Sequence, residues 1–98
     1  MLEPRSVPPL DFVKIEALRT HMLLTTEQMA KLLSVSRITY YGWKGGKPVR
    51  KVNAERVRHV LRKMLRVLTR DEWPSLAVIA MTSEQRFAKL VEAMEQAN

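Results

Sequence analysis

The chain has 98 residues, of which 17 are Lys or Arg and 10 are Asp or Glu, and its net charge is +7. This length supports one domain with one modest core, and the excess of positive charge favours a polyanionic partner. The absence of cysteine excludes disulfide bonds and thiolate metal sites and fits a reducing cytoplasm, and no apolar run approaches the roughly 18 residues of a membrane-spanning helix.

Prolines at positions 4, 8 and 9 predict that residues 1–10 form a flexible N-terminal segment. Its single cation, Arg5, favours a loose terminus over an arm that follows DNA. Asp11 is a good N-cap for a helix over residues 12–22. The inward stripe of that helix consists of apolar residues at helical spacing, namely Phe12, Ile15, Leu18 and Met22.

Two short helices joined by a tight turn are predicted between positions 24 and 46. Thr25 caps the first, over residues 26–33, because its hydroxyl can accept from backbone N–H groups while Gln28 returns the bond in a capping box. One face of this helix is apolar and consists of Met29, Ala30, Leu32 and Leu33. Ser34 and Ser36 then interrupt the pattern, since serine prefers caps and turns.

The second helix of the pair has Ser36 as its N-cap and runs to about Lys44, where the glycines at 45–46 supply the positive φ that ends helices. Tyr40 and Trp43 lie three residues apart, so we expect both to face inward. The outward face then carries Arg37, Ile38, Tyr41 and Gly42.

This stretch resembles the helix-turn-helix of the phage repressor and Cro family, also called the XRE family. The residues at or near that family's characteristic positions are Leu24, Thr25, Glu27, Met29, Ala30, Leu33, Val35, Ser36, Thr39, Trp43, Gly46 and Pro48. The chain departs from the family at Ser34, where members have a turn glycine, at the larger Tyr40, and at Gly42, where members often carry a base-reading side chain. The resemblance extends from Leu24 to about Met64. It implies an all-α fold: a lambda-repressor-like helix-turn-helix domain of four helices that binds double-stranded DNA.

The resemblance also implies roles for single residues. In the family, the second helix enters the major groove and touches base edges with its first residues and those one turn later. By position these base-reading residues are Ser36, Arg37, Ile38 and Tyr41. Arg37 can pair with a guanine, Ile38 can meet a thymine methyl, and Tyr41 can touch a base or a phosphate. The residues expected to bind the phosphate backbone are Thr25, Thr26, Gln28, Lys44, Lys47, Arg50 and Lys51.

A basic loop and a long helix follow. Pro48 keeps residues 47–52 out of a helix, and beside a helix-turn-helix the loop cations favour phosphate contact over plain solvation.

Asn53 is expected to cap a helix over residues 54–69. Its apolar half holds Val57, Val60, Leu61, Met64, Leu65, Val67 and Leu68. Its basic half holds Arg56, Arg58, Arg62, Lys63, Arg66 and Arg70. The nearly uniform sign indicates either an auxiliary phosphate-binding face, with Arg58, Arg62 and Arg66, or a solvated one, with contact to an acidic protein as a third alternative.

The balance of charge changes at residue 71. Residues 1–70 hold 15 basic and 5 acidic residues, whereas residues 71–98 hold 2 and 5. We therefore expect the DNA-binding domain at residues 11–70 and a C-terminal helical extension at residues 71–98, which adds one or two helices.

Within this extension, Pro74 fits the first turn of a short helix over the apolar residues 76–81, buried on most sides. Thr82 or Ser83 then caps a last helix that runs to about Gln96. The apolar stripe of this last helix consists of Phe87, Leu90, Val91 and Met94. The two helices either form a dimer interface with a second copy or complete the core of a single chain.

No arrangement of residues predicts catalysis, a cofactor or a metal. His21 and His59 fall on different predicted helices and lack the spacing of a metal pair. The chain contains neither a nucleophile elbow nor a phosphate-cradling glycine motif. We therefore expect a binding protein and not an enzyme.

Together these features predict a small phage- or plasmid-type transcriptional repressor that binds double-stranded DNA as a homodimer, in the cytoplasm of a bacterial cell or phage-infected host. Two copies across a two-fold axis would read half-sites about 34 Å apart. Two alternatives stay open. One is a phage-type adaptor whose basic helix binds an acidic surface of a host protein such as RNA polymerase. The other is a DNA-packaging or replication component with the same fold.

Overall fold

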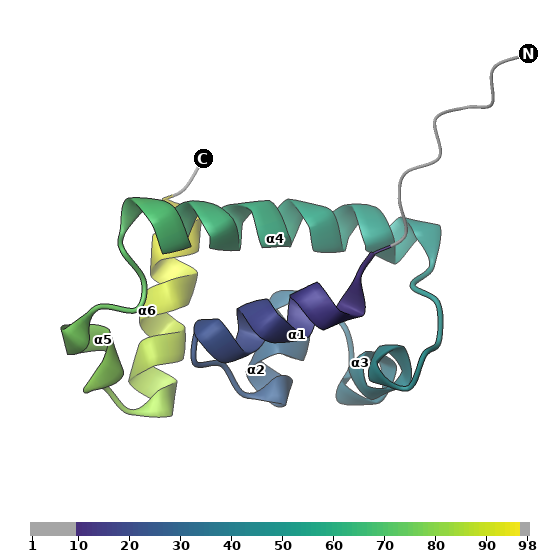
Figure 1. The fold of residues 1–98 in the computed structure, drawn as a ribbon, viewed down its shortest axis with the longest axis horizontal. Coiled ribbons are helices and arrows are strands. Elements are labelled where there is room, and N and C mark those ends of the chain that lie inside the picture. Colours follow the sequence, from purple (N-terminus) through teal and green to yellow (C-terminus); the bar gives the residue numbers. More distant parts are fainter. Residues whose placement is uncertain (1–9, 97–98) are drawn as a thin grey trace, which may run out of the picture.

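The computed structural model describes residues 10–96, so the predicted flexible segment lies outside the described residues except for Leu10. Within this range the chain forms six α-helices and no strand, which confirms the all-α fold class. The helices are α1 (Phe12–His21), α2 (Thr26–Leu32), α3 (Arg37–Lys44), α4 (Lys51–Arg70), α5 (Leu76–Ile79) and α6 (Ser83–Glu95). In Figure 1, α4 runs along one edge, α1 to α3 lie below it, and α6 rises beside them so that its C-terminal end lies near the end of α4.

Most helices begin at the predicted caps. Asp11 accepts from a backbone N–H of α1, and Ser36 does the same for α3. Thr25 and Gln28 form the expected capping box, with both hydrogen bonds at 3.0 Å. Thr82, the first of the two residues considered, caps α6 in a second capping box. These starts were predictable because a cap depends only on residues within one turn.

The start of α4 differs from the prediction. The helix begins at Lys51, and the side chain of the cap residue Arg50 makes no capping hydrogen bond. Asn53 lies inside the helix, where its Oδ1 accepts from Arg56 Nη2 at 2.9 Å. Pro48 restricts the backbone of the residue before it and not of those after it, so nothing delays the helix until residue 54. The Asn53 cap is therefore wrong, and Lys51 belongs to the first turn of α4.

The turn between α2 and α3 is a Schellman motif. The backbone N–H of Val35 donates to Ala30 O at 3.0 Å, and that of Ser34 donates to Lys31 O at 3.1 Å. Ser34 has φ of 59°, which glycine adopts most readily. Ser34 therefore occupies a left-handed position that favours glycine.

The apolar run of the extension is less buried than expected. Only four of its residues form α5, and of these Val78 alone is buried. Leu76 is 86% exposed, so burial on most sides was wrong, because a single helical turn presents only one side to the core. Pro74 precedes Ser75, the N-cap of α5, and so lies outside the first turn.

One hydrophobic cluster joins all six helices. In α4 the apolar half faces this cluster except at Leu65, which is 47% exposed and marks the edge of the buried stripe. The extension contributes to the same cluster through Trp73, Val78, Leu90 and Met94. The indole Nε1 of Trp73 also donates to Met22 O at the end of α1, at 3.2 Å. The C-terminal helices thus complete the core of the single chain.

Candidate nucleic-acid interface

Two buried aromatic residues fix the orientation of α3. Tyr40 and Trp43 are buried, as expected, and their ring centroids lie 5.0 and 6.5 Å from that of Phe12 in α1. The opposite side of α3 is open to solvent: Ile38 is 83% exposed and Tyr41 is 49% exposed. The exposed side of α3 thus carries Ile38 and Tyr41, with Arg37 at its start and Lys44 Nζ 5.6 Å from the centroid of the Tyr41 ring.

Arg37, at the start of α3, reaches back to α2. Its Nη1 lies 3.1 Å from Glu27 Oε1, and both side chains are well exposed. An exposed pair of this kind is worth about 1 kcal/mol or less. Glu27 therefore holds the guanidinium across the turn but leaves it free to exchange the carboxylate for a stronger acceptor. The sequence placed Glu27 in the family pattern without predicting this role.

The other residues predicted on the outward face of α3 differ in whether their side chains already have a structural role. Ser36 Oγ accepts from Thr39 N at 3.0 Å and donates to Thr39 Oγ1 at 2.9 Å, so the cap occupies it. Gly42 is half-buried, and a Cβ built there would lie 3.2 Å from Cδ of Lys47. Of the four predicted base-reading residues, Arg37, Ile38 and Tyr41 project outward without a structural role in capping.

A shared carboxylate joins α1 to α3. Glu16 accepts from Tyr40 Oη and from Arg19 Nε and Nη2, and its Oε1 lies 3.4 Å from Lys44 Nζ. Burial acts to raise the pKa of Glu16, but the hydrogen bonds from Arg19 and Tyr40 and the nearby cations outweigh it and hold that pKa below its ordinary value. Burial and the bond to Glu16 raise the pKa of Tyr40 well above its ordinary value, so the phenol stays a donor. Glu16 therefore links α1 to α3 through both Tyr40 and Lys44.

The contacts of Glu16 were not predicted from the sequence, although the position of this residue pointed to a buried partner. Glu16 follows Phe12 by four residues, which places its carboxylate on the flank of the apolar stripe of α1. An acid at such a position needs a buried partner. The network also involves Lys44, a predicted phosphate ligand, whose Nζ lies 5.6 Å from the centroid of the Tyr41 ring.

The N-terminus of α2 contains the three predicted phosphate ligands Thr25, Thr26 and Gln28. Thr25 is exposed but is part of the capping box, and Thr26 is half-buried. Gln28 is fully used, because its Oε1 accepts within the capping box and its Nε2 donates to Ser83 Oγ and Ser83 O at 3.0 and 3.2 Å. The structure therefore gives Gln28 a second function, which is to brace α2 against the start of α6. No sequence signal marked Ser83 as its partner.

A cationic segment connects α3 to α4. Lys47, Arg50 and Lys51 are all exposed, as expected for phosphate ligands. The first turn of α4 contains no acidic residue and has no side-chain cap. Its free backbone N–H groups carry the positive end of the helix dipole. The segment and the helix start therefore produce a concentrated positive potential beside α3.

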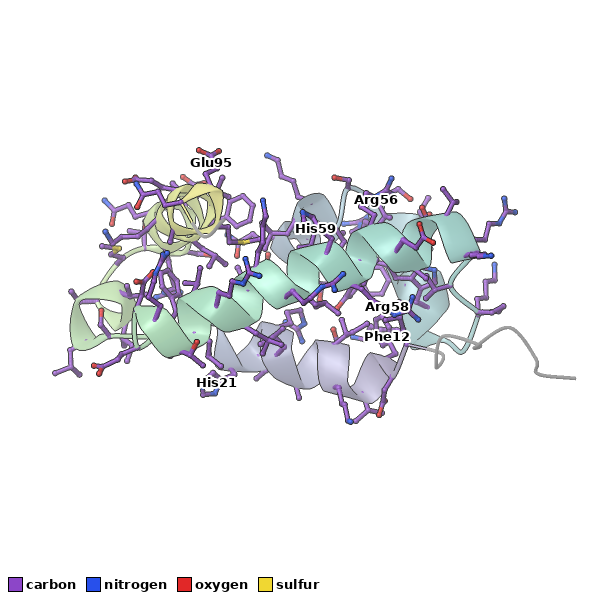
Figure 2. All side chains as sticks on the ribbon, turned by 90° about the horizontal axis from the view of Figure 1, so that it is seen from above. Phe12, His21, Arg56, Arg58, His59 and Glu95 are labelled. Atoms are coloured by element: carbon purple, nitrogen blue, oxygen red, sulfur yellow. The ribbon has the colours of Figure 1, made fainter. Side chains whose placement is uncertain are left out.

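The exposed side of α4 carries the predicted auxiliary cations. Arg62 and Arg66 are exposed and Arg58 is half-buried. Arg56 has a different role, since it donates to the carbonyls of Leu33 and Ser34, each at 3.3 Å, and so supports the end of α2. Figure 2 looks down onto α4 and shows Arg56, Arg58 and His59 along this helix.

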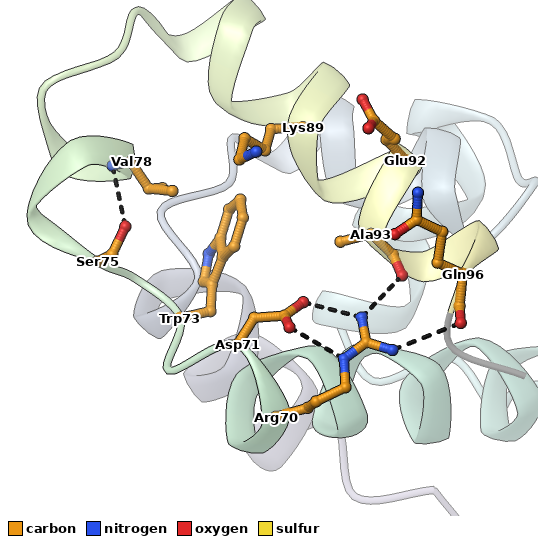
Figure 3. Close-up of a pocket in the computed structure, with 9 residues that line it drawn as sticks. All are labelled: Arg70, Asp71, Trp73, Ser75, Val78, Lys89, Glu92, Ala93 and Gln96. Atoms are coloured by element: carbon orange, nitrogen blue, oxygen red, sulfur yellow. Dashed lines mark hydrogen bonds and ion pairs between the residues drawn. The ribbon is translucent and has the colours of Figure 1, made fainter.

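Two cavities lie away from α3. The larger, of about 440 Å³, opens between the end of α4 and α6 (Figure 3). There Arg70 donates to both carboxylate oxygens of Asp71 at 2.9 Å, and these bonds hold the pKa of Asp71 below its ordinary value. Lys89 and Glu92 also line it, so acids and bases balance and no ligand charge is favoured. The second, of about 310 Å³, is lined by Leu10, Asp11, Lys14, Ile15, Leu18, Leu61 and Leu65.

Within residues 10–96, no group of three His, Asp or Glu side chains is placed to hold a metal ion. Figure 2 shows His21 well separated from His59. Over the same range no helix combines the length and the apolar character needed to cross a membrane.

Comparison of the chain with models of protein families, with curated proteins and with solved structures found no match.

Proposed function

We propose that the protein is a sequence-specific, double-stranded DNA-binding transcriptional regulator with a lambda-repressor-like fold, in which α3 is the recognition helix. The observation that carries this proposal is the exposed face of α3. Tyr40 and Trp43 anchor one side of the helix in the core, and Arg37, Ile38 and Tyr41 project from the other. The major groove of B-DNA, about 12 Å wide, admits one α-helix of this kind.

The chemistry of the three projecting residues suits base edges. Arg37 exchanges its weak pair with Glu27 for two acceptors on a guanine, which the planar guanidinium matches bidentately. Ile38 packs on a thymine methyl, and Tyr41 lies beside it, one turn along from Arg37. In this arrangement Glu27 holds Arg37 near its binding geometry before DNA arrives.

Phosphate contacts come from the positive segment beside α3. Lys47, Arg50 and Lys51 extend from the end of α3 into the uncapped first turn of α4, and both the charges and the free N–H groups attract a phosphate. Thr25 and Thr26 serve the adjacent phosphate at the start of α2. Gln28 does not itself contact that phosphate, because its amide is bound to Ser83. It instead braces α2 against the start of α6.

We place the protein as a homodimeric repressor of the small phage or plasmid type. The dimer follows from the resemblance to the repressor family, since helix-turn-helix dimers read half-sites related by a two-fold axis. Such a dimer presents two α3 helices to two half-sites.

Selection from a pool of random duplexes, with salt raised between rounds to suppress binding to the backbone alone, tests the proposal. The expected result is an enriched palindromic motif. Arg37→Ala should then lose about 1–3 kcal/mol at one base position, whereas Lys51→Ala should weaken all sequences alike and reduce the salt slope by about one unit.

A uniform loss for Arg37→Ala on every sequence would make Arg37 a phosphate ligand. If no motif is enriched despite binding at low salt, the recognition role of α3 is wrong. A stoichiometric protein partner would then favour the adaptor alternative.

A further inference from the structure

The end of α3 brings Lys47 against the helix. The backbone N–H of Lys47 donates to Gly42 O at 3.0 Å, and that of Gly46 donates to Trp43 O at 3.0 Å. Gly46 has φ of 102°, so these residues form a Schellman motif, in which Gly42 and Lys47 are the two outermost positions. The side chains at these two positions of the motif frequently make an apolar contact. The backbone therefore places the Lys47 side chain next to Gly42.

Gly42 leaves room for the methylene carbons of Lys47. A Cβ built at Gly42 would lie 3.2 Å from Cδ and 4.0 Å from Cγ of Lys47. Because the shorter distance is closer than Cβ atoms ordinarily approach, even an alanine at this position requires the Lys47 side chain to shift by a few tenths of an ångström. The methylene carbons of Lys47 thus occupy the space that a side chain at residue 42 would take.

This space lies on the outward side of α3. Ile38 precedes Gly42 by four residues, and residues four apart on a helix share a face. Ile38 is 83% exposed, whereas Tyr40 and Trp43 are buried on the opposite side of the helix. The Lys47 side chain therefore lies along the face of α3 that we propose enters the major groove.

The Lys47 ammonium is available to a ligand. Within residues 10–96, Arg37 and Lys44 pair with carboxylates, but Lys47 forms no ion pair. A long side chain that must be immobilised on binding weakens affinity by about two- to tenfold. A side chain that is already packed along the helix in the free protein avoids much of this ordering cost.

We propose that Gly42 is a positioning residue for DNA binding. Because it lacks a side chain, it seats the methylene carbons of Lys47 along α3 and so holds the ammonium beside the groove, ready for a backbone phosphate. This inference rests on the proposed function of α3. It gives a reason for a glycine inside a helix, where glycine lowers stability relative to alanine.

A double-mutant cycle in DNA affinity tests this inference. The Kd of the full-length protein for the selected motif duplex is measured at fixed salt for the wild type, Gly42→Leu, Lys47→Ala and the double variant. The leucine fills the space of the Lys47 methylene carbons. The matched control combines Gly42→Leu with Arg50→Ala, which removes a neighbouring cation and leaves Lys47 in place. Urea unfolding checks that each variant is folded, and Gly42→Leu should be at least as stable as the wild type because leucine favours a helix.

We expect Gly42→Leu to weaken binding by about two- to tenfold, which corresponds to the ordering of one long side chain. Lys47→Ala should weaken binding by about three- to tenfold and reduce the salt slope by about one unit. The double variant should bind no more weakly than Lys47→Ala, because no Lys47 side chain is left to displace. In the Arg50→Ala background the leucine should keep its full effect.

Three results would overturn the inference while the motif duplex still binds. An undiminished affinity of Gly42→Leu would show that the seat has no effect. A loss that persists in the Lys47→Ala background would show that the leucine collides with DNA itself. An unchanged salt slope for Lys47→Ala would remove its ammonium from the interface. Failure of the wild type to bind any selected duplex would instead refute the proposed function, and this inference with it.

Discussion

Replacement of Glu16 by alanine tests how α3 is held. The change leaves the fully buried Tyr40 hydroxyl without its acceptor, which costs about 1–3 kcal/mol. The pairs with Arg19 and Lys44 are partly exposed and add about 1 kcal/mol or less. Arg19 keeps its bond to Leu24 O at 2.8 Å, so it is not left unpaired. We therefore expect a loss of about 2–3 kcal/mol, which in a domain of this size lowers the Tm by roughly 10–20 °C.

Urea and thermal unfolding of the purified variants measure this loss. Glu16→Gln is the matched control, because its amide oxygen still accepts from Tyr40, and it should lose only about 1 kcal/mol. A double-mutant cycle with Tyr40→Phe should give a coupling energy of about 0.5–3 kcal/mol between the two side chains. An unfolding midpoint of Glu16→Ala equal to that of the wild type would refute the reasoning, as would a coupling energy of zero.

The same carboxylate makes stability depend on pH. The pKa of Glu16 is lower in the folded chain than its ordinary value of 4.5. Its stabilisation is therefore complete above pH 4.5 and is lost as the pH falls through the lowered value. Urea midpoints measured from neutral pH down to about 3 should decline less steeply in Glu16→Gln than in the wild type. Identical slopes would show that Glu16 titrates normally.

Three further substitutions test other parts of the fold by urea unfolding. Gly42→Ala should stabilise the protein by about 0.5–1 kcal/mol, because the only close neighbour of the new Cβ is the flexible side chain of Lys47; destabilisation would mean that this side chain cannot move. Gly46→Ala, at φ of 102°, should instead cost about 1–3 kcal/mol, and a neutral effect would contradict the conformation. Trp73→Phe removes the donor to Met22 O and should cost about 1–3 kcal/mol; an unchanged midpoint would make that bond irrelevant.

The sequence predicted local features well and interactions between distant residues poorly. The caps Thr25 and Ser36 were correct because each depends on residues within the next turn. Asn53 satisfied the same local rule, yet the helix began earlier because the chain after Pro48 was free to become helical. Leu65 followed the helical period but fell at the edge of the buried stripe, since the width of that stripe is set by packing partners.

In the candidate site, too, local features were predicted correctly and contacts between distant residues were not. The exposure of Ile38 and the burial of Tyr40 follow from the position of each residue on one short helix, so both were predictable. The contacts of Glu16 with Tyr40 and of Gln28 with Ser83 join residues 24 and 55 positions apart. Nothing in the spacing of the sequence identifies such pairs, because the folded chain alone brings them together.

The hydrogen bond from Trp73 to Met22 bears on whether residues 11–70 can be separated from the rest of the chain. Residues 11–70 are not a complete structural unit, because the end of α1 and the residues beyond α4 share one core. A recombination event that moved residues 11–70 into another protein would carry an unpaired carbonyl and an open apolar surface with it. The heritable unit of this protein therefore extends at least to Met94, and the extension must be inherited with the helices that would read DNA.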